Sequence, residues 1–160
     1  MHINDILAEK GGEIYAVTSG QSLLDAVTVM MEHNIGSVLV MDENRLAGIL
    51  TNRHILSALR ENGDVVTQYQ VNDLMSAEVI TCSPGDSIDQ ALQVMNQYQI
   101  RYLPVIEEGQ LCGIVSMGDL VNASNNACWF ENRLLKRYIK TWPEEQRGAG
   151  LKLVVNNTKP

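Results

Sequence analysis

The sequence predicts an α+β fold made of two similar repeats, each running strand, helix, strand, strand, helix. The main observation is an ungapped internal repeat. At a shift of 65 residues, Gly20-Gln21-Ser22 aligns with Gly85-Asp86-Ser87, and Gly48-Ile49-Leu50-Thr51 aligns with Gly113-Ile114-Val115-Ser116. Each copy also carries a serine suited to cap a helix and two apolar runs around a polar turn. Such a duplication predicts two units packed about a pseudo-two-fold axis, with paired clefts between them.

The first strand and helix of each repeat are predicted from local signals. Residues 14–17 are β-compatible and precede a turn at Ser19-Gly20. Ser22 then begins a helix, with Asp25 three residues on, a spacing typical of a capped N-terminus. Apolar residues follow at helical spacing, which predicts one buried face. In the second repeat Ser87 and Gln90 take the same places, after a Pro84-Gly85 turn.

Two short strands and a second helix complete each repeat. Residues 37–41 and 46–50 flank a polar turn, as do residues 102–106 and 111–115, so both pairs predict β-hairpins. A second helix is expected from Asn52 to about Arg60, with its counterpart beginning at Met117 or Gly118. The polar residues 61–70 form the predicted linker.

The predicted organisation is a first repeat over 1–64, a second repeat over 65–123, an amphipathic helix over 124–143 and a disordered tail over 144–160. A short echo precedes each repeat, because residues 3–7 resemble residues 71–75 at a shift of 68. Apolar and basic residues alternate at helical spacing in the C-terminal helix. It is expected to pack on its own domain or on a dimer partner, with a membrane surface as the alternative.

Composition excludes several function classes. A net charge of −7 over 160 residues argues against broad nucleic-acid binding, which needs a basic face. No apolar run approaches the roughly 20 residues that span a membrane, and no secretory signal follows Met1. Cys82, Cys112 and Cys128 lack metal-ligand spacing, so they are expected to be buried, reduced thiols of a cytoplasmic protein.

Catalytic motifs are absent from the sequence. It contains no P-loop, no GxGxxG, no HExxH and no nucleophile elbow. His2, His33 and His54 share no metal-ligand spacing with a cysteine or with one another. We therefore expect no catalytic residues and no metal site, and a protein that is not an enzyme.

Two segments resemble the cystathionine-beta-synthase (CBS) domain family: residues 48–55, Gly-Ile-Leu-Thr-Asn-Arg-His-Ile, and residues 113–120, Gly-Ile-Val-Ser-Met-Gly-Asp-Leu. Residues 101–105, Arg-Tyr-Leu-Pro-Val, are similar to the family's strand that leads into the nucleotide cleft. The resemblance covers residues 3–123 and implies a stand-alone bacterial CBS pair, forming a disc-like dimer. Its clefts would bind an adenosine-containing ligand, with AMP as the first candidate and ADP, ATP, NAD or S-adenosylmethionine as others.

The second repeat carries the residues that the resemblance implies for a nucleotide. Asp119 occupies the family's ribose-binding position, and two carboxylate oxygens suit a vicinal diol. Ser116, three residues earlier, would present a hydroxyl to the cleft. The alternative is that both only cap the following helix. Arg101 could hold phosphate oxygens, or be a solvated arginine at a strand edge.

Further contacts are expected around the base. Pro104 and Ile114 would wall an adenine ring, while backbone groups near Ile80 and Thr81 would read its polar edge. The alternative for Ile114 is aliphatic core. Tyr102 replaces the histidine frequent at that place in the family, which leaves its phosphate contact open.

The first repeat departs from the family pattern, because His54 stands where the second has Asp119. Thr51 keeps the hydroxyl. His54 and Arg53 could contribute to phosphate binding, or the cleft could be degenerate and His54 a solvated helix residue. We therefore expect one well-formed nucleotide site in each chain.

Together these features predict a regulatory nucleotide-binding module, a homodimer that signals to a regulated protein not identifiable from the sequence. The alternative is a ligand-free interaction scaffold, in which Asp119 and Ser116 are only helix caps.

Overall fold

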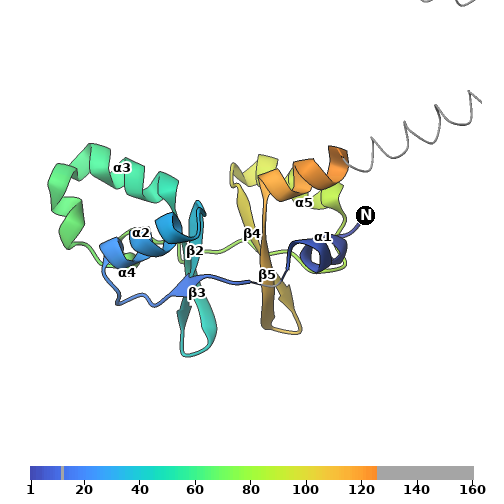
Figure 1. The fold of residues 1–160 in the computed structure, drawn as a ribbon, viewed down its shortest axis with the longest axis horizontal. Helices are drawn as coiled ribbons and strands as arrows, with labels where there is room; N and C mark the ends of the chain where they lie inside the picture. The colour runs from blue at the N-terminus through green and yellow to red at the C-terminus, as the bar shows by residue number, and fades with distance from the viewer. Residues whose placement is uncertain (12, 126–160) are drawn as a thin grey trace, which may run out of the picture. The chain divides into compact units, whose positions relative to one another are not determined.

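The computed structural model describes residues 1–11 and 13–125, in which helices accompany two small β-sheets (Figure 1). One sheet has the strand order β1-β2-β3, from β1 (Ala16–Val17), β2 (Ser37–Asp42) and β3 (Arg45–Thr51). The other pairs β4 (Tyr102–Glu107) with β5 (Gln110–Ser116). The C-terminal helix and tail predicted beyond residue 125, and Cys128, lie outside the described residues.

The two predicted hairpins are confirmed, and they match in detail. β2 runs antiparallel to β3 and β4 antiparallel to β5, with a bulge in each at aligned places, Val40/Met41 and Val105/Ile106. The turns are two residues long. Their φ values are +49° and +62° at Glu43-Asn44 and +51° and +80° at Glu108-Gly109. Positive φ at both central residues is what type I′ turns require, and such turns fit the strand twist. The hairpins project to the same side (Figure 1).

The serine caps are confirmed as well. α2 (Leu23–Glu32) begins after Ser22, and α5 (Ile88–Tyr98) begins after Ser87. Each serine Oγ accepts the amide three residues on, at 3.1 Å in α2 and 3.2 Å in α5. α3 (Asn52–Asn62) follows β3 and ends two residues later than predicted, and its counterpart begins at residue 117.

One predicted strand is much shorter than expected. The opening strand of the second repeat is reduced to a single parallel bridge between Cys82 and Val105, where the first repeat has β1. The chain turns away at once, because the Asp86 amide donates to the Ser83 carbonyl at 3.1 Å. Pro84, inside that turn, has no amide hydrogen to extend a ladder.

Each half of the unit takes its leading helix from across the predicted repeat boundary. α1 (Ile3–Lys10) packs against β5 of the second half, where Ile3 and Ile6 join the core. α4 (Val71–Leu74) belongs to the core of the first half through Val71. The sequence echo at a shift of 68 marks these two helices, which were not predicted as helices from the sequence. The predicted linker contains a 3₁₀ helix, η1 (Gly63–Gln68).

This exchange makes two chain segments cross between the halves. Residues 13–15 precede β1, and residues 76–80 lead from α4 into the second repeat. The core of each half stays separate, and its largest fully buried side chains are apolar. The two connecting segments, one before β1 and one after α4, therefore pass the strand ends where the ligand residues were predicted.

Candidate functional site

Two cavities lie at the two crossings. The Asp119 cavity has a volume of about 410 Å³, and its lining residues include Lys10, Glu13, Tyr15, Ile114, Ser116 and Asp119. The His54 cavity has a volume of about 1040 Å³, and its lining residues include Thr51, Arg53, His54, Arg60, Glu78 and Ile80. Arg101 and Tyr102 line both cavities.

The two cavities are counterparts under the internal repeat. At the shift of 65, Thr51 aligns with Ser116, His54 with Asp119 and Tyr15 with Ile80, each pair contributing one residue to each cavity. The predicted pair of clefts is therefore present in the described unit. Their chemistry differs because the aligned residues differ.

The structure divides the predicted ligand residues between the cavities. Asp119, Ser116 and Ile114 line the smaller one, and Thr51, Arg53, His54 and Ile80 line the larger one, with Arg101 and Tyr102 shared. Whether these residues touch a ligand stays a prediction.

The residues expected around the adenine ring do not all line the Asp119 cavity. Ile80 does not share a cavity with Asp119, because the segment before the second repeat crosses to the first half and lies beside Thr51. Tyr15 takes the corresponding place beside Asp119. Thr81 is exposed and lines neither cavity. Pro104 also lines neither, since it is buried in β4, where its carbonyl accepts the Cys82 amide at 3.0 Å.

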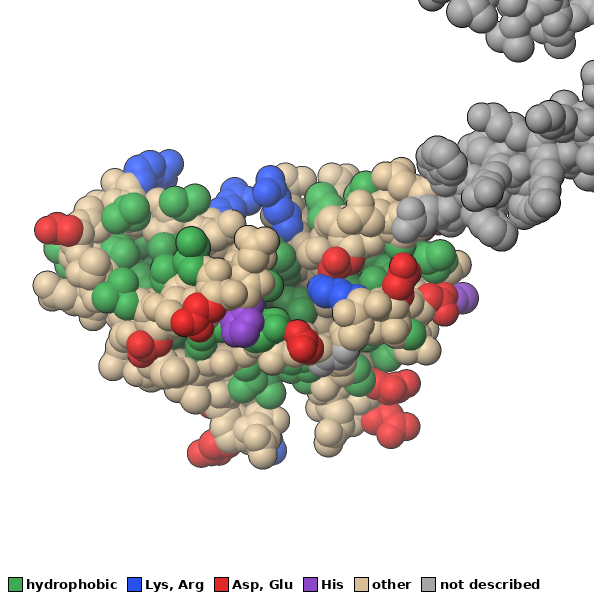
Figure 2. All heavy atoms as spheres, in the orientation of Figure 1, with side chains coloured by type: hydrophobic (Ala, Val, Ile, Leu, Met, Phe, Trp, Pro, Cys, Tyr) green, Lys and Arg blue, Asp and Glu red, His purple; other side chains and the backbone are tan. Residues whose placement is uncertain are grey.

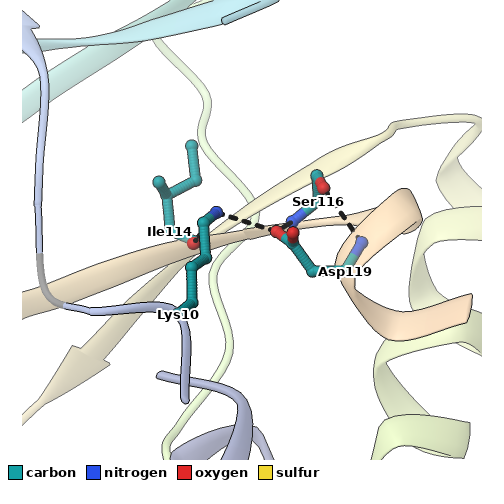
Figure 3. Close-up of polar contacts among 4 residues, drawn as sticks. All are labelled: Lys10, Ile114, Ser116 and Asp119. Carbon is teal, nitrogen blue, oxygen red and sulfur yellow. Dashed lines mark hydrogen bonds and ion pairs between the residues drawn. The ribbon is translucent and has the colours of Figure 1, made fainter. Parts of the chain in front are cut away.

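Asp119 caps its helix and also borders a cavity (Figure 3). Its Oδ2 accepts the Ser116 amide at 2.8 Å, and its own amide donates to Ser116 Oγ at 3.2 Å. This reciprocal pair is a capping box. Within the described part of the chain Oδ1 accepts no hydrogen bond, so one carboxylate oxygen is left over from the cap. The capping role and a ligand role are therefore compatible.

Lys10, at the end of α1, reaches the same carboxylate. Its Nζ donates to Asp119 Oδ2 at 2.8 Å and to the Ile114 carbonyl at 3.3 Å (Figure 3). Burial alone would raise the pKa of Asp119, but the hydrogen bonds from Lys10 and Ser116 outweigh it and lower the pKa below its usual value. Asp119 is therefore a carboxylate at neutral pH, able only to accept hydrogen bonds.

Tyr102 stands between the cavities. Its Oη packs so closely on Gly36 that a Cβ there would overlap it, so Gly36 gives room to the ring. Arg101 precedes Tyr102 at the start of β4 and is exposed. A residue at either position can thus contact a ligand on either side.

His54 performs the cap of α3 with a ring nitrogen in place of a carboxylate. Its Nδ1 accepts the Thr51 amide at 3.2 Å, and its own amide donates to Thr51 Oγ1 at 3.4 Å. Burial, followed by the nearby charge of Arg53, lowers the pKa of His54. With Nδ1 as acceptor, the neutral ring carries its proton on Nε2. Beyond its cap, His54 can therefore only donate a hydrogen bond.

The lining residues of the Asp119 cavity that were not predicted from the sequence include Lys10, Glu13 and Tyr15. They lie on or after α1, more than 100 residues before Asp119 in the chain. Tyr15 stacks on His33 with ring centroids 3.9 Å apart, and its hydroxyl donates to Glu13 at 2.7 Å. The alignment of Tyr15 with Ile80 was the signal that could have found it.

The described residues contain little that suggests covalent or metal chemistry. Cys82 is buried as predicted, and burial raises the pKa of its thiol to about 11, while Cys112 is only half-buried. No group of His, Cys, Asp or Glu within 1–11 and 13–125 is arranged to hold a metal ion. In the same residues, no helix combines the length and apolarity that crossing a bilayer demands.

Comparison with known proteins adds independent findings. A sequence model of the CBS domain matches residues 5–61 and 71–126. The Bacillus subtilis CBS domain-containing protein YhcV is 37% identical over 116 residues, which cover 71% of this chain and 81% of that protein.

Solved structures agree. The CBS-domain containing protein ATU1752 from Agrobacterium tumefaciens superposes with a TM-score of 0.75 at 32% identity, covering 77% of this chain and 92% of that one. The CBS domain pair of protein MJ0100, solved in complex with 5′-methylthioadenosine and S-adenosyl-L-methionine, gives a TM-score of 0.70 at 26% identity. The superposition covers 79% of this chain and 98% of the MJ0100 chain.

Proposed function

Because this chain belongs to the CBS domain family, as a tandem pair, we propose that it is a regulatory module that binds an adenosine-containing nucleotide in the Asp119 cavity. The observation that carries this proposal is the Asp119 carboxylate. Its side chain is 25% exposed beside the cavity, and Oδ1 is not used by the helix cap. A ribose offers two adjacent hydroxyl donors, and hydrogen bonds to a charged acceptor are the strong ones.

The size of the cavity supports a small nucleotide. Its volume of about 410 Å³ lies toward the lower end of the roughly 300–1,000 Å³ typical of ligand pockets. AMP is therefore the first candidate, with ADP, ATP and NAD as larger ones. Lys10 and Arg101 border the cavity, together with the acids Glu13 and Asp119, and offer hydrogen-bond donors to a phosphate. The adenosine ligands of MJ0100 support the ligand class.

Lys10 couples ligand binding at Asp119 to the position of α1. A ribose that took Asp119 Oδ2 would compete with the Lys10 ammonium, which already holds that oxygen at 2.8 Å. Since Lys10 ends α1, and α1 packs on β5, such competition would bias the position of that helix. A ligand that prefers one arrangement of α1 shifts the population toward it, which is how a partner could sense occupancy.

The proposal is one of binding without turnover. A buried thiol with a raised pKa is unsuited to nucleophilic catalysis. A cytoplasmic location is part of the proposal. A homodimer and a regulated partner protein are part of the proposal. Exposed apolar side chains on α3 support an interface there, with Leu56 64% exposed and Leu59 48% exposed.

The test is thermal unfolding and calorimetric titration of the full chain with AMP, ADP, ATP, NAD and S-adenosylmethionine. A ligand at a hundred times its dissociation constant should stabilise the fold by about 2.7 kcal/mol. Asp119→Asn removes the charge but keeps a cap oxygen. It should weaken binding of the active compound at least about tenfold, as expected for a hydrogen bond to a charged group.

Asp73→Asn is the matched control. Asp73 Oδ2 accepts the Gln70 amide at 2.8 Å, so it caps α4 as Asp119 caps its helix, and it lines neither cavity. Its variant should bind like the unmodified chain. No stabilisation by any compound at millimolar concentration would contradict the proposal and favour the interaction scaffold. Equal weakening by both variants would contradict the role of Asp119.

A further inference from the structure

The ion pair between Lys10 and Asp119 joins two distant parts of the chain at the edge of the Asp119 cavity. Lys10 Nζ lies 2.8 Å from Asp119 Oδ2, and the two side chains are 40% and 25% exposed. Lys10 ends α1, whereas Asp119 lies in the first turn of the helix that begins at residue 117. The pair is 109 residues apart in the sequence, so it depends on the packing of α1 against β5.

The two carboxylate oxygens of Asp119 are unequally occupied (Figure 3). Oδ2 accepts both the Ser116 amide and the Lys10 ammonium, each at 2.8 Å. A carboxylate has about four acceptor positions on its two oxygens, so two donors fill Oδ2. Among the described residues no donor reaches Oδ1. A vicinal diol that bonds to both oxygens must therefore displace one of the two donors from Oδ2.

Lys10 is the donor that can leave. The Ser116 amide belongs to the backbone at the end of β5, and its bond to Oδ2 is half of the cap of the following helix. The Lys10 ammonium sits on a flexible stem and is partly exposed, so it can turn away. Its other bond, to the Ile114 carbonyl at 3.3 Å, is too long to replace a carboxylate.

A displaced ammonium finds little negative charge to replace Asp119 within the cavity. Glu13, the other acid that lines it, is exposed and already accepts the Tyr15 hydroxyl at 2.7 Å. A pair with Glu13 would be an exposed one, of small energy. An uncharged ligand that took Oδ2 would therefore leave Lys10 without a strong partner.

A phosphate group on the ligand supplies the missing anion. A phosphate monoester carries roughly −1.5 to −2 charges at neutral pH and forms strong hydrogen bonds with an ammonium. The chain has 12 Lys and Arg against 19 Asp and Glu, and Figure 2 shows acidic side chains spread over one face with fewer basic ones. Attraction of an anion to this acidic protein therefore depends on the cations at the cavity, Lys10 and Arg101.

From these contacts we propose that Lys10 determines ligand specificity, by making the Asp119 cavity prefer a phosphorylated nucleoside over the same nucleoside without phosphate. The ribose takes Asp119 Oδ2 from Lys10, and the phosphate of the same ligand becomes the new partner of the ammonium. A nucleoside without phosphate makes the first exchange without the second. The inference rests on the proposed function, because it needs a ribose at Asp119.

The test is calorimetric titration of AMP and of adenosine into the full chain and into Lys10→Met, which keeps a long side chain without its charge. AMP should bind Lys10→Met at least about tenfold more weakly, as expected for the loss of a bond between charged groups. Adenosine should bind this variant as tightly as the unmodified chain or more tightly, because no ammonium has to be displaced. A variant that only loosened α1 would weaken both ligands.

Two further variants complete the comparison. Lys10→Arg keeps the charge and should keep the preference for AMP. Arg45→Gln removes a positive charge from the β2–β3 hairpin and lines neither cavity, so it should bind both compounds like the unmodified chain. If circular dichroism shows that Lys10→Met does not fold, Lys10→Gln, which also lacks the charge, carries the comparison.

The outcomes separate this inference from the proposed function. If AMP binds and the ratio of AMP to adenosine affinity is the same in Lys10→Met as in the unmodified chain, the inference is overturned and the proposed function stands. Equal weakening of both ligands, or adenosine binding the unmodified chain as tightly as AMP, would have the same meaning. Failure of every adenosine compound to bind would remove the proposed function, and this inference with it.

Discussion

Asp119 and His54 occupy aligned positions but give the two cavities different hydrogen-bonding groups. Both accept the amide three residues earlier, at 2.8 Å and 3.2 Å, and both donate their own amide to the hydroxyl of that residue. The helix start is therefore built in the same way in both repeats. The carboxylate has a second oxygen to offer a ligand, and the imidazole has only a donor.

The lowered pKa of His54 predicts a pH dependence of stability. Burial and the charge of Arg53 lower the pKa in the folded chain, so the unfolded chain binds this proton more readily. The contribution of the neutral His54 side chain to stability is therefore complete above the ordinary histidine pKa of about 6.5. It is lost as pH falls through the lower pKa of the folded chain. Protonation of Nδ1 would also break its bond from the Thr51 amide.

The measurement compares urea unfolding of the unmodified chain and His54→Asn between about pH 8 and about pH 5. Asparagine offers a cap oxygen but does not titrate in this range. The free-energy difference between the two proteins should move in favour of His54→Asn as pH falls. Acidic residues with lowered pKa, such as Asp42 and Asp119, are common to both proteins and cancel. A difference in unfolding free energy that stays constant over the whole pH range would contradict the lowered pKa of His54.

At the scale of elements, two glycines hold the exchanged helices in place. Gly48 in β3 lies under the end of α4, where an added Cβ would be 2.8 Å from Met75 Sδ and 2.8 Å from the Ser76 carbonyl oxygen. Gly113 in β5 lies under α1, where a Cβ would be 2.8 Å from Leu7 Cδ2. The first contact includes backbone, which cannot turn aside, and the second is the tip of a side chain.

Gly48→Ala should therefore lower the free energy of unfolding by about 1–3 kcal/mol, the usual cost of overpacking. Gly113→Ala should cost less, because Leu7 can change rotamer. Gly85→Ala is the control, since nothing lies within 4 Å of its Cβ position. Urea unfolding of the three variants checks the order. A Gly48→Ala protein as stable as Gly85→Ala would contradict the close packing of α4 on β3.

The elements that the sequence predicted well are those defined by neighbours in the chain. Ser22 and Ser87 cap helices through residues three positions away, and the type I′ turns depend on two residues each. The opening strand of the second repeat was predicted too long, because its single bridge at Cys82 depends on a turn around Pro84. α1 was missed, since Ile3 and Ile6 are buried only by the distant second half.

At the scale of the whole described unit, the exchange of leading helices explains what sequence reasoning could and could not place. The internal repeat was enough to predict paired clefts and the residues at their strand ends, Asp119 and Thr51 among them. It could not show that Ile80 crosses to Thr51 while Lys10 and Tyr15 cross to Asp119. Those pairings are set by packing between segments about 30 to 100 residues apart.

The exchange also gives the unit a way to respond to a ligand. Each cavity is bordered by a segment that leads from the helix packed on one half to the opening strand of the other half, as the segment after Lys10 leads from α1 to β1. Contacts made in a cavity can therefore favour one packing of the two halves over another.

A crystal structure of the full chain with AMP tests the central claim most directly. Both ribose hydroxyls should lie within hydrogen-bond distance, about 2.5–3.0 Å, of the Asp119 carboxylate, with Lys10 moved away from Oδ2. AMP seated elsewhere, with the 2.8 Å contact between Lys10 and Asp119 unchanged, would contradict it.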